Sequence, residues 1–482
     1  MSSTMLTAPV ATAERTLLRL ATAGSVDDGK STLVGRLLFD TKSVLTDTLT
    51  AVEAASVRKG LGRTDLALLT DGLRAEREQG ITIDVAYRYF ATSRRKFVLA
   101  DCPGHVQYTR NTVTGSSTAD VIVLLVDARN GVVSQTRRHL AVAALLRVPH
   151  VVLVINKMDL VDWSQVVFDT IATDFAILCR SLGVGDSHCI PVSSLEGDNA
   201  VFKSTRMDWY EGPTLLAYLE SVDDTPTAVG ADLRFPVQWV VRPQGAQLPP
   251  WAAQAPQVDE SLGIDRDYRG YAGKIEAGRV SVGEEIVVLP RGSHARVTGI
   301  DTPDGPLQTA VAGQSVVLRI DRDVDLSRGD LVAATSAPPA AVREISGTLC
   351  WLAERPVRPR DRVLVQHGTA VVQAIVRSID GRLDLDAPAG PTWRPADSLD
   401  LNDIGRAHLQ LAAPLPVDQY REQRHTGAFI VVDPGDGWTL AAGMVGGTAL
   451  DHAAIQAPPQ TPSTAPCGVS DDPTNHPGKA AS

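Results

Sequence analysis

Up to about residue 225, short runs of apolar residues alternate with segments that have helical spacing. The runs lie at 97–100, 121–126, 151–155 and 189–192, and they are rich in β-branched residues. Continuous runs of this kind are typical of parallel strands that are buried on both faces of a sheet. Their alternation with helices predicts an α/β fold with an open, doubly wound, mostly parallel sheet.

The pattern changes after residue 232, where short strands with glycine turns replace the alternation. Two blocks of this kind follow, and each predicts a small β-barrel. The end of the chain is rich in Pro, Ser, Thr and Ala, which predicts disorder because it has little to bury. The predicted domains are a flexible N-terminus at 1–14, an α/β domain at 15–227, β-barrel domains at 232–338 and 343–452, and a disordered tail at 456–482.

A glycine-rich turn lies between the apolar run at 17–23 and a helical segment at 32–38. Such a turn directs backbone N–H groups toward one point at a helix N-terminus, where phosphate binds. Lys30 is expected to reach the β- and γ-phosphates of a nucleotide, and the Ser31 hydroxyl to bind Mg²⁺. A chance match in a glycine-containing loop is the alternative. The expected contacts are Gly24, Ser25, Val26, Asp27, Asp28, Gly29, Lys30, Ser31 and Thr32.

A second motif, Asp-Cys-Pro-Gly-His at 101–105, directly follows the apolar run at 97–100. A carboxylate at the end of a strand beside a phosphate loop can hold Mg²⁺, so Asp101 is predicted to do so. The Gly104 N–H is then expected to contact the γ-phosphate. An ordinary turn is the alternative, because Asp and Pro occur at preferred turn positions.

A third motif, Asn-Lys-Met-Asp at 156–159, follows the run at 151–155 and predicts a guanine site. The Asp159 carboxylate can accept hydrogen bonds from adjacent N–H groups of guanine, whereas adenine offers the wrong donors. Asn156 can bind the base or brace the phosphate loop, and the Lys157 stem can cover the ring. A helix-capping turn is the alternative. A weaker signal is Ser193, Ser194 and Leu195, where a backbone N–H commonly meets guanine O6.

The segment Glu-Arg-Glu-Gln-Gly-Ile-Thr-Ile at 76–83 lies between the phosphate loop and Asp101. Thr82 is expected to offer its hydroxyl to Mg²⁺ and its N–H to the γ-phosphate, in a segment that is released after hydrolysis. A charged helix end followed by an edge strand is the alternative. His105 stands where small GTPases place a water-orienting glutamine, and it is expected to orient the attacking water. The order of these motifs predicts a Mg²⁺-dependent GTPase with catalytic roles for His105, Thr82 and Lys30.

The net charge and the cysteine spacing bear on which partners, metal sites and cellular location are expected. With 46 Lys and Arg against 56 Asp and Glu, the net charge is −10, which argues against nucleic acid as the main partner. The five cysteines form no paired spacing that indicates a disulfide framework or a zinc site. No secretory signal and no apolar segment of membrane-spanning length is recognised, so a cytoplasmic location without membrane contact is expected.

These motifs, with two β domains behind them, make the chain resemble the translational GTPases, above all elongation factor Tu. Within that superfamily the blocks at 24–33, 71–90 and 107–120 resemble the large, GTPase subunit of sulfate adenylyltransferase. Shorter matches at 235–243, 269–273 and 426–430 extend the resemblance through both β domains. The loop from Gln244 to Asp267 is longer than usual for this family.

The resemblance implies GTP as the nucleotide, Mg²⁺ as its metal, and a small ATP-pyrophosphatase-like catalytic subunit as partner, in a heterodimer or larger assembly. That partner would form adenosine 5′-phosphosulfate from ATP and sulfate, driven by GTP hydrolysis on this chain. The chain has no Ser-Gly-Gly-x-Asp-Ser loop, so it is not expected to bind the ATP that is cleaved. A second phosphate loop is also absent and the tail is short, so no adenylylsulfate kinase activity is expected. The alternative is an elongation-factor-like translational GTPase that binds tRNA.

Overall fold

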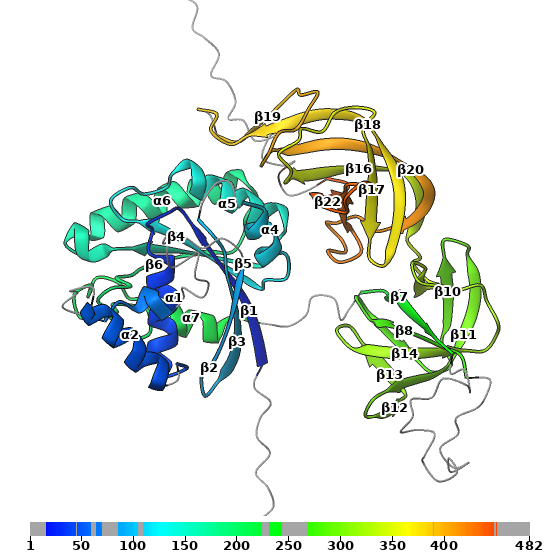
Figure 1. Cartoon of the computed structure of the whole chain (residues 1–482), viewed down its shortest axis with the longest axis horizontal. Coiled ribbons are helices and arrows are strands. Elements are labelled where there is room, and N and C mark those ends of the chain that lie inside the picture. The colour runs from blue at the N-terminus through cyan, green and yellow to red at the C-terminus, as the bar shows by residue number, and fades with distance from the viewer. Residues whose placement is uncertain are drawn as a thin grey trace, which may run out of the picture.

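We describe the chain from a computed structural model, which describes residues 16–44, 46–58, 64–69, 85–104, 109–223, 231–242, 268–388, 390–447 and 450. Several predicted features lie outside these residues: the N-terminus at 1–14, the tail at 456–482, and the whole of the predicted insertion at 244–267. The described residues form three bodies, which are an α/β domain followed by two β domains (Figure 1).

The α/β domain is built on a six-stranded sheet with the order β2-β3-β1-β4-β5-β6. All neighbours pair in parallel except the edge strand β2, which is antiparallel to β3. The predicted class, an open and mostly parallel sheet, is therefore confirmed. The strands are β1 (Thr16–Gly24), β2 (Ala86–Ala91), β3 (Arg95–Asp101), β4 (Val121–Asp127), β5 (His150–Asn156) and β6 (Ser187–Pro191).

Helices cover both faces of this sheet (Figure 1). The helices are α1 (Lys30–Asp40), α2 (Thr46–Arg58), α4 (Thr109–Ser117), α5 (Ser134–Leu145), α6 (Gln165–Ser181) and α7 (Leu215–Ser221), with the short turns η1 (Leu66–Leu69) and η3 (Met158–Val161). One apolar core joins α1 and α7 to the sheet, and a second joins α4, α5 and α6 to the opposite face. Strand β4 is buried along its whole length because both cores use its side chains.

The middle domain, residues 231–336 as far as they are described, is a β-barrel with its own core. Its seven-stranded sheet has the order β10-β15-β7-β8-β14-β11-β12, and an added pairing of β10 with β11 closes it. The strands are β7 (Arg234–Val241), β8 (Gly270–Lys274), β9 (Arg279–Ser281), β10 (Glu285–Leu289), β11 (Ser293–Thr302), β12 (Gly305–Leu307), β13 (Thr309–Val311), β14 (Ser315–Ile320) and β15 (Leu331–Ala334).

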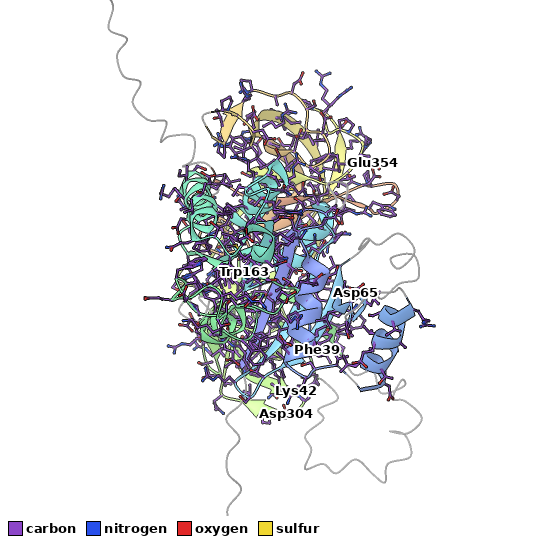
Figure 2. The ribbon with its side chains drawn as sticks, turned by 90° about the vertical axis from the view of Figure 1, so that its left-hand side faces the viewer. Phe39, Lys42, Asp65, Trp163, Asp304 and Glu354 are labelled. Atoms are coloured by element: carbon purple, nitrogen blue, oxygen red, sulfur yellow. The ribbon has the colours of Figure 1, made fainter. Side chains whose placement is uncertain are left out.

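The third domain begins with β16, and it is also a closed barrel. Its order is β17-β21-β22-β16-β20-β18-β19, and β17 also pairs with β18. The strands are β16 (Ala340–Trp351), β17 (Arg362–His367), β18 (Ala370–Asp384), β19 (Thr392–Arg394), β20 (Ile404–Val417), β21 (Ala428–Val432) and β22 (Thr439–Val445). In a view from the side, Glu354 of this domain lies at the top and Asp304 of the middle domain at the bottom (Figure 2).

The third domain packs on α4 and α5 of the α/β domain. The Tyr420 hydroxyl donates to the Leu146 carbonyl at 2.8 Å, and Arg424 donates to the Ser117 carbonyl at 2.9 Å. Apolar side chains of both domains belong to one continuous core. Within the described residues, no helix has the length and apolar character of a membrane span.

Candidate functional site

Four neighbouring strands end in polar groups or glycine at one edge of the six-stranded sheet. β1 ends at Gly24, β3 at Asp101, β4 at Asp127 and β5 at Asn156. The strand register places Thr22 beside Asp101 and places Asp127 beside Asn156. The carboxyl ends of parallel strands are where open α/β sheets bind ligands. The phosphate loop, the Asp101 motif and the Asn156 motif therefore meet at this edge of the sheet, as far as they are described.

The phosphate loop connects β1 to α1, and Lys30 follows it as the first residue of the helix. Gly29 has a left-handed backbone (φ 91°) and precedes the first residue of the helix. The Lys30 ammonium donates to the carbonyls of Gly24 at 2.9 Å and Ser25 at 2.8 Å. Burial lowers the pKa of Lys30, and the nearby Asp101 carboxylate opposes that effect. A buried cation at a helix N-terminus is suited to phosphate oxygens.

The loop also has a hydroxyl that no described protein group uses. The buried Ser25 hydroxyl has no hydrogen-bond partner among the described residues. A Cβ added at Gly104 would lie 2.4 Å from Lys30 Nζ, so a side chain there would displace the ammonium. The Gly104 backbone therefore lies directly against the Lys30 ammonium, and the unpartnered Ser25 hydroxyl is a donor that fits a phosphate oxygen.

A carboxylate and a hydroxyl for Mg²⁺ lie beside this position. Asp101 is buried, and its Oδ1 accepts from the Thr22 hydroxyl at 2.9 Å. Ser31 lies in the first turn of α1, next to Lys30. Oxygen ligands of these two kinds are those that Mg²⁺ prefers. The side chains present therefore fit a magnesium ion, with Ser31 and Asp101 as its predicted protein ligands.

Asp28 has a role inside the loop. Its Oδ2 accepts the Ser25 N–H at 2.6 Å, and only 5% of the residue is exposed. Burial raises the pKa of Asp28, while the Ser25 hydrogen bond and the Lys30 charge oppose the rise. The carboxylate therefore braces the turn, whereas Val26 is exposed and Asp27 has a left-handed backbone (φ 65°).

Asn156 joins three loops of the site. Its Nδ2 donates to the Asp28 carbonyl at 2.7 Å, and its Oδ1 accepts from the N–H and the hydroxyl of Ser194 at 3.0 and 2.8 Å. Both ends of the amide are thus used within the protein. The sequence left two roles open for Asn156, binding the base or bracing the phosphate loop, and these hydrogen bonds favour the second.

The predicted base-reading residues lie on the turn after β5. The Ser193 hydroxyl donates to Asp159 Oδ1 at 2.6 Å, which joins this turn to the loop after β6. The Ser193 and Ser194 amides donate to Asp198 and Asn156. Since these two amides are used within the protein, Leu195 carries the amide of this segment that fits the predicted contact with guanine O6.

Sequence reasoning missed Asp127, Arg129 and His139. Asp127 is 2% exposed and pairs with Arg129 and Lys157. His139 of α5 is fully buried, lies 3.0 Å from the Gln135 amide nitrogen, and interacts with the Gly24 backbone. Burial and the Lys30 charge lower the pKa of His139 to about 3. Asp127 ends a buried strand just as Asp101 does, so the same argument could have found it.

Two predicted catalytic residues lie outside the described residues. Thr82 belongs to the undescribed stretch 70–84, and His105 to the stretch 105–108. Their roles in binding Mg²⁺ and orienting water stay predictions.

Comparisons with known proteins agree with this geometry. The family model of the elongation factor Tu GTP binding domain matches residues 15–225, and that of the GTP-eEF1A C-terminal domain matches residues 344–446. The chain is 43% identical to sulfate adenylyltransferase subunit 1 of Cellvibrio japonicus, over 90% of this chain and 87% of that protein. The same-named protein of Salmonella typhimurium is 44% identical, over 90% and 87%.

A longer relative is the bifunctional enzyme CysN/CysC of Mycobacterium tuberculosis, which is 48% identical over 89% of this chain. The chain spans about two thirds of that protein's length. The fold and the site together define a GTP-binding protein of the elongation factor Tu class, with two β-barrel domains behind the nucleotide-binding domain. Within that class, the chain belongs to the family of sulfate adenylyltransferase subunit 1.

Proposed function

We propose that this chain, as a GTPase subunit of sulfate adenylyltransferase, hydrolyses GTP to drive the reaction of ATP and sulfate to adenosine 5′-phosphosulfate and diphosphate. The adenylyl transfer itself would take place on a separate small catalytic subunit. The observation that carries the proposal is the identity of 43–45% to proteins named sulfate adenylyltransferase subunit 1, over about nine-tenths of the chain.

The site supports a division of work among its residues. Lys30 holds the β- and γ-phosphates, and Asp159 accepts the guanine N–H groups. Ser31, Thr82 and Asp101 would hold Mg²⁺, which neutralises phosphate charge when it is bound. Asn156 and Asp28 fix the loops so that these groups face one position. His105 would orient the water that attacks the γ-phosphate.

The energy coupling is proposed to run through the segments that contact the γ-phosphate. Thr82 and the Gly104 N–H hold these segments while the γ-phosphate is present. Their release after hydrolysis would change the contacts of the α/β domain with the β domains or with the partner. The third domain already packs on α4, which begins at Thr109, shortly after Gly104.

The test is reconstitution with the small catalytic subunit. GTP hydrolysis is expected to rise when ATP and sulfate are both added, and adenosine 5′-phosphosulfate is expected to accumulate only while GTP is consumed. Stimulation by ribosomes, or co-purification of tRNA, would instead support a translational GTPase. Adenosine 5′-phosphosulfate formation that is indifferent to GTP would contradict the coupling.

A further inference from the structure

The buried carboxylate of Asp127 is surrounded by donors from Arg129 and Lys157. Its Oδ1 accepts from the backbone N–H of Arg129 at 2.9 Å and from Arg129 Nε at 3.0 Å. Its Oδ2 lies 2.6 Å from Arg129 Nη2 and 2.9 Å from Lys157 Nζ. One carboxylate thus joins the end of β4 to the guanine-reading turn after β5.

This carboxylate keeps its charge although it is 2% exposed. Burial alone would raise its pKa, but the hydrogen bonds from Arg129 and Lys157 hold the pKa of Asp127 well below its usual range. Charge-assisted hydrogen bonds of this kind are stronger than neutral ones. The pair with Lys157 is therefore a fixed contact at neutral pH.

The backbone of Lys157 is fixed as well. It has a left-handed conformation (φ 62°), and the preceding residue, Asn156, is hydrogen-bonded to the phosphate loop. With the backbone and Nζ both held, the aliphatic stem of Lys157 is confined between Asp127 and the turn that carries Asp159. A free lysine side chain has many rotamers, so this double anchor removes most of its freedom before a ligand binds.

We propose that Asp127 is a positioning residue of the base pocket: it holds Lys157 so that the lysine stem is ready to pack against bound guanine. The proposal rests on GTP binding at this edge of the sheet. Because both nucleotides carry the same base, Asp127 acts equally on GTP and GDP affinity and has no part in cleavage of the γ-phosphate.

The test measures nucleotide affinity of the full chain with a fluorescent GDP analogue, with GTP and GDP as competitors. Asp127→Asn keeps the shape of the side chain but removes its charge, and it is expected to weaken GTP and GDP alike by about tenfold or more. Unchanged affinity, or a loss confined to GTP, would overturn the proposal.

A double-mutant cycle separates positioning from a general structural role. Lys157→Met is expected to lose as much affinity as Asp127→Asn, and the double variant no more than either. Lys157→Arg, which still reaches the carboxylate, is expected to restore most of the affinity. Additive losses would contradict the role of the pair. If Asp127→Asn fails to fold, an arginine variant as weak as the methionine variant would contradict it on its own.

Arg129→Ala is the matched control, because it removes the other cation from the same carboxylate. The Arg129 side chain is 51% exposed, so its loss is expected to change affinity by less than about threefold. If Arg129→Ala loses as much nucleotide affinity as Asp127→Asn, the carboxylate anchors the whole loop after β4 and does not act through Lys157. If the wild-type chain binds no GTP, the proposed function fails. If the wild type binds GTP and the Asp127 and Lys157 variants bind it with the same affinity, only this inference fails.

Discussion

Asp159 is held by Ser193 from another loop, so its carboxylate has a defined direction before any base arrives. Replacing it by asparagine exchanges an acceptor for a donor at the guanine N–H groups. Asp159→Asn is expected to lower GTP affinity by about a hundredfold and to favour xanthosine triphosphate, measured by competition binding. The control is Asp162→Asn on the same turn, which is left-handed and lies outside the base-reading motif. Retained guanine preference would remove Asp159 from base recognition.

His139 gives the chain a pH dependence of known sign. Its pKa is about 3 in the folded protein and about 6.5 when unfolded, so the unfolded state binds the proton first as the pH falls. Stability is therefore present above pH 6.5 and is lost progressively below it. In urea denaturation, wild type is expected to lose about 1 kcal/mol more than His139→Asn between pH 7.5 and 5.5. The exposed His188→Asn is the control; equal losses in all three proteins would contradict the assignment.

The turn into α1 depends on a glycine. Gly29 has φ 91°, and a Cβ there would lie 2.4 Å from the Asn156 amide nitrogen. Gly29→Ala is expected to displace Asn156 from the phosphate loop and to weaken GDP binding by about a hundredfold, with a stability loss of about 1–3 kcal/mol. Gly185→Ala is the matched control, because no atom lies within 4 Å of the position that a Cβ would take there. Fluorescence titration and thermal unfolding of both variants test this prediction.

Among the secondary-structure elements, the sequence patterns predicted the buried central strands better than the edge strand β2. The runs at 121–126 and 151–155 correspond closely to β4 and β5, because both cores need continuous apolar side chains there. Strand β2 gave no such signal, since an edge strand buries few side chains. The position of Asp127 at the end of a buried strand could be read from the sequence, but its polar contacts and those of His139 could not. They depend on which loops and helices meet in space, and no sequence motif records that.

The two β domains are joined by a buried ion pair. Arg234 of the middle domain donates to Asp418 of the third domain at 2.8 and 2.9 Å, and both side chains are at most 10% exposed. Arg234→Met would leave the Asp418 charge buried without its partner, so a stability loss of about 3 kcal/mol is expected in urea denaturation. The less buried pair Arg382–Asp403, with side chains 46% and 20% exposed, supplies the control, Arg382→Met, which is expected to lose less than about 1 kcal/mol. If Arg234→Met and Arg382→Met lose the same stability, burial does not determine the strength of the interdomain ion pair.

The core shared by the α/β domain and the third domain has a consequence for synthesis of the chain. The ribosome completes α5 well before Cys350 and Met444, whose side chains continue the same core, have been made. During that interval the apolar face of the nascent α/β domain has no cover, and exposed faces of this kind promote aggregation. Premature termination after the α/β domain would leave that face open permanently, so a chaperone-dependent, poorly soluble fragment is the expected product.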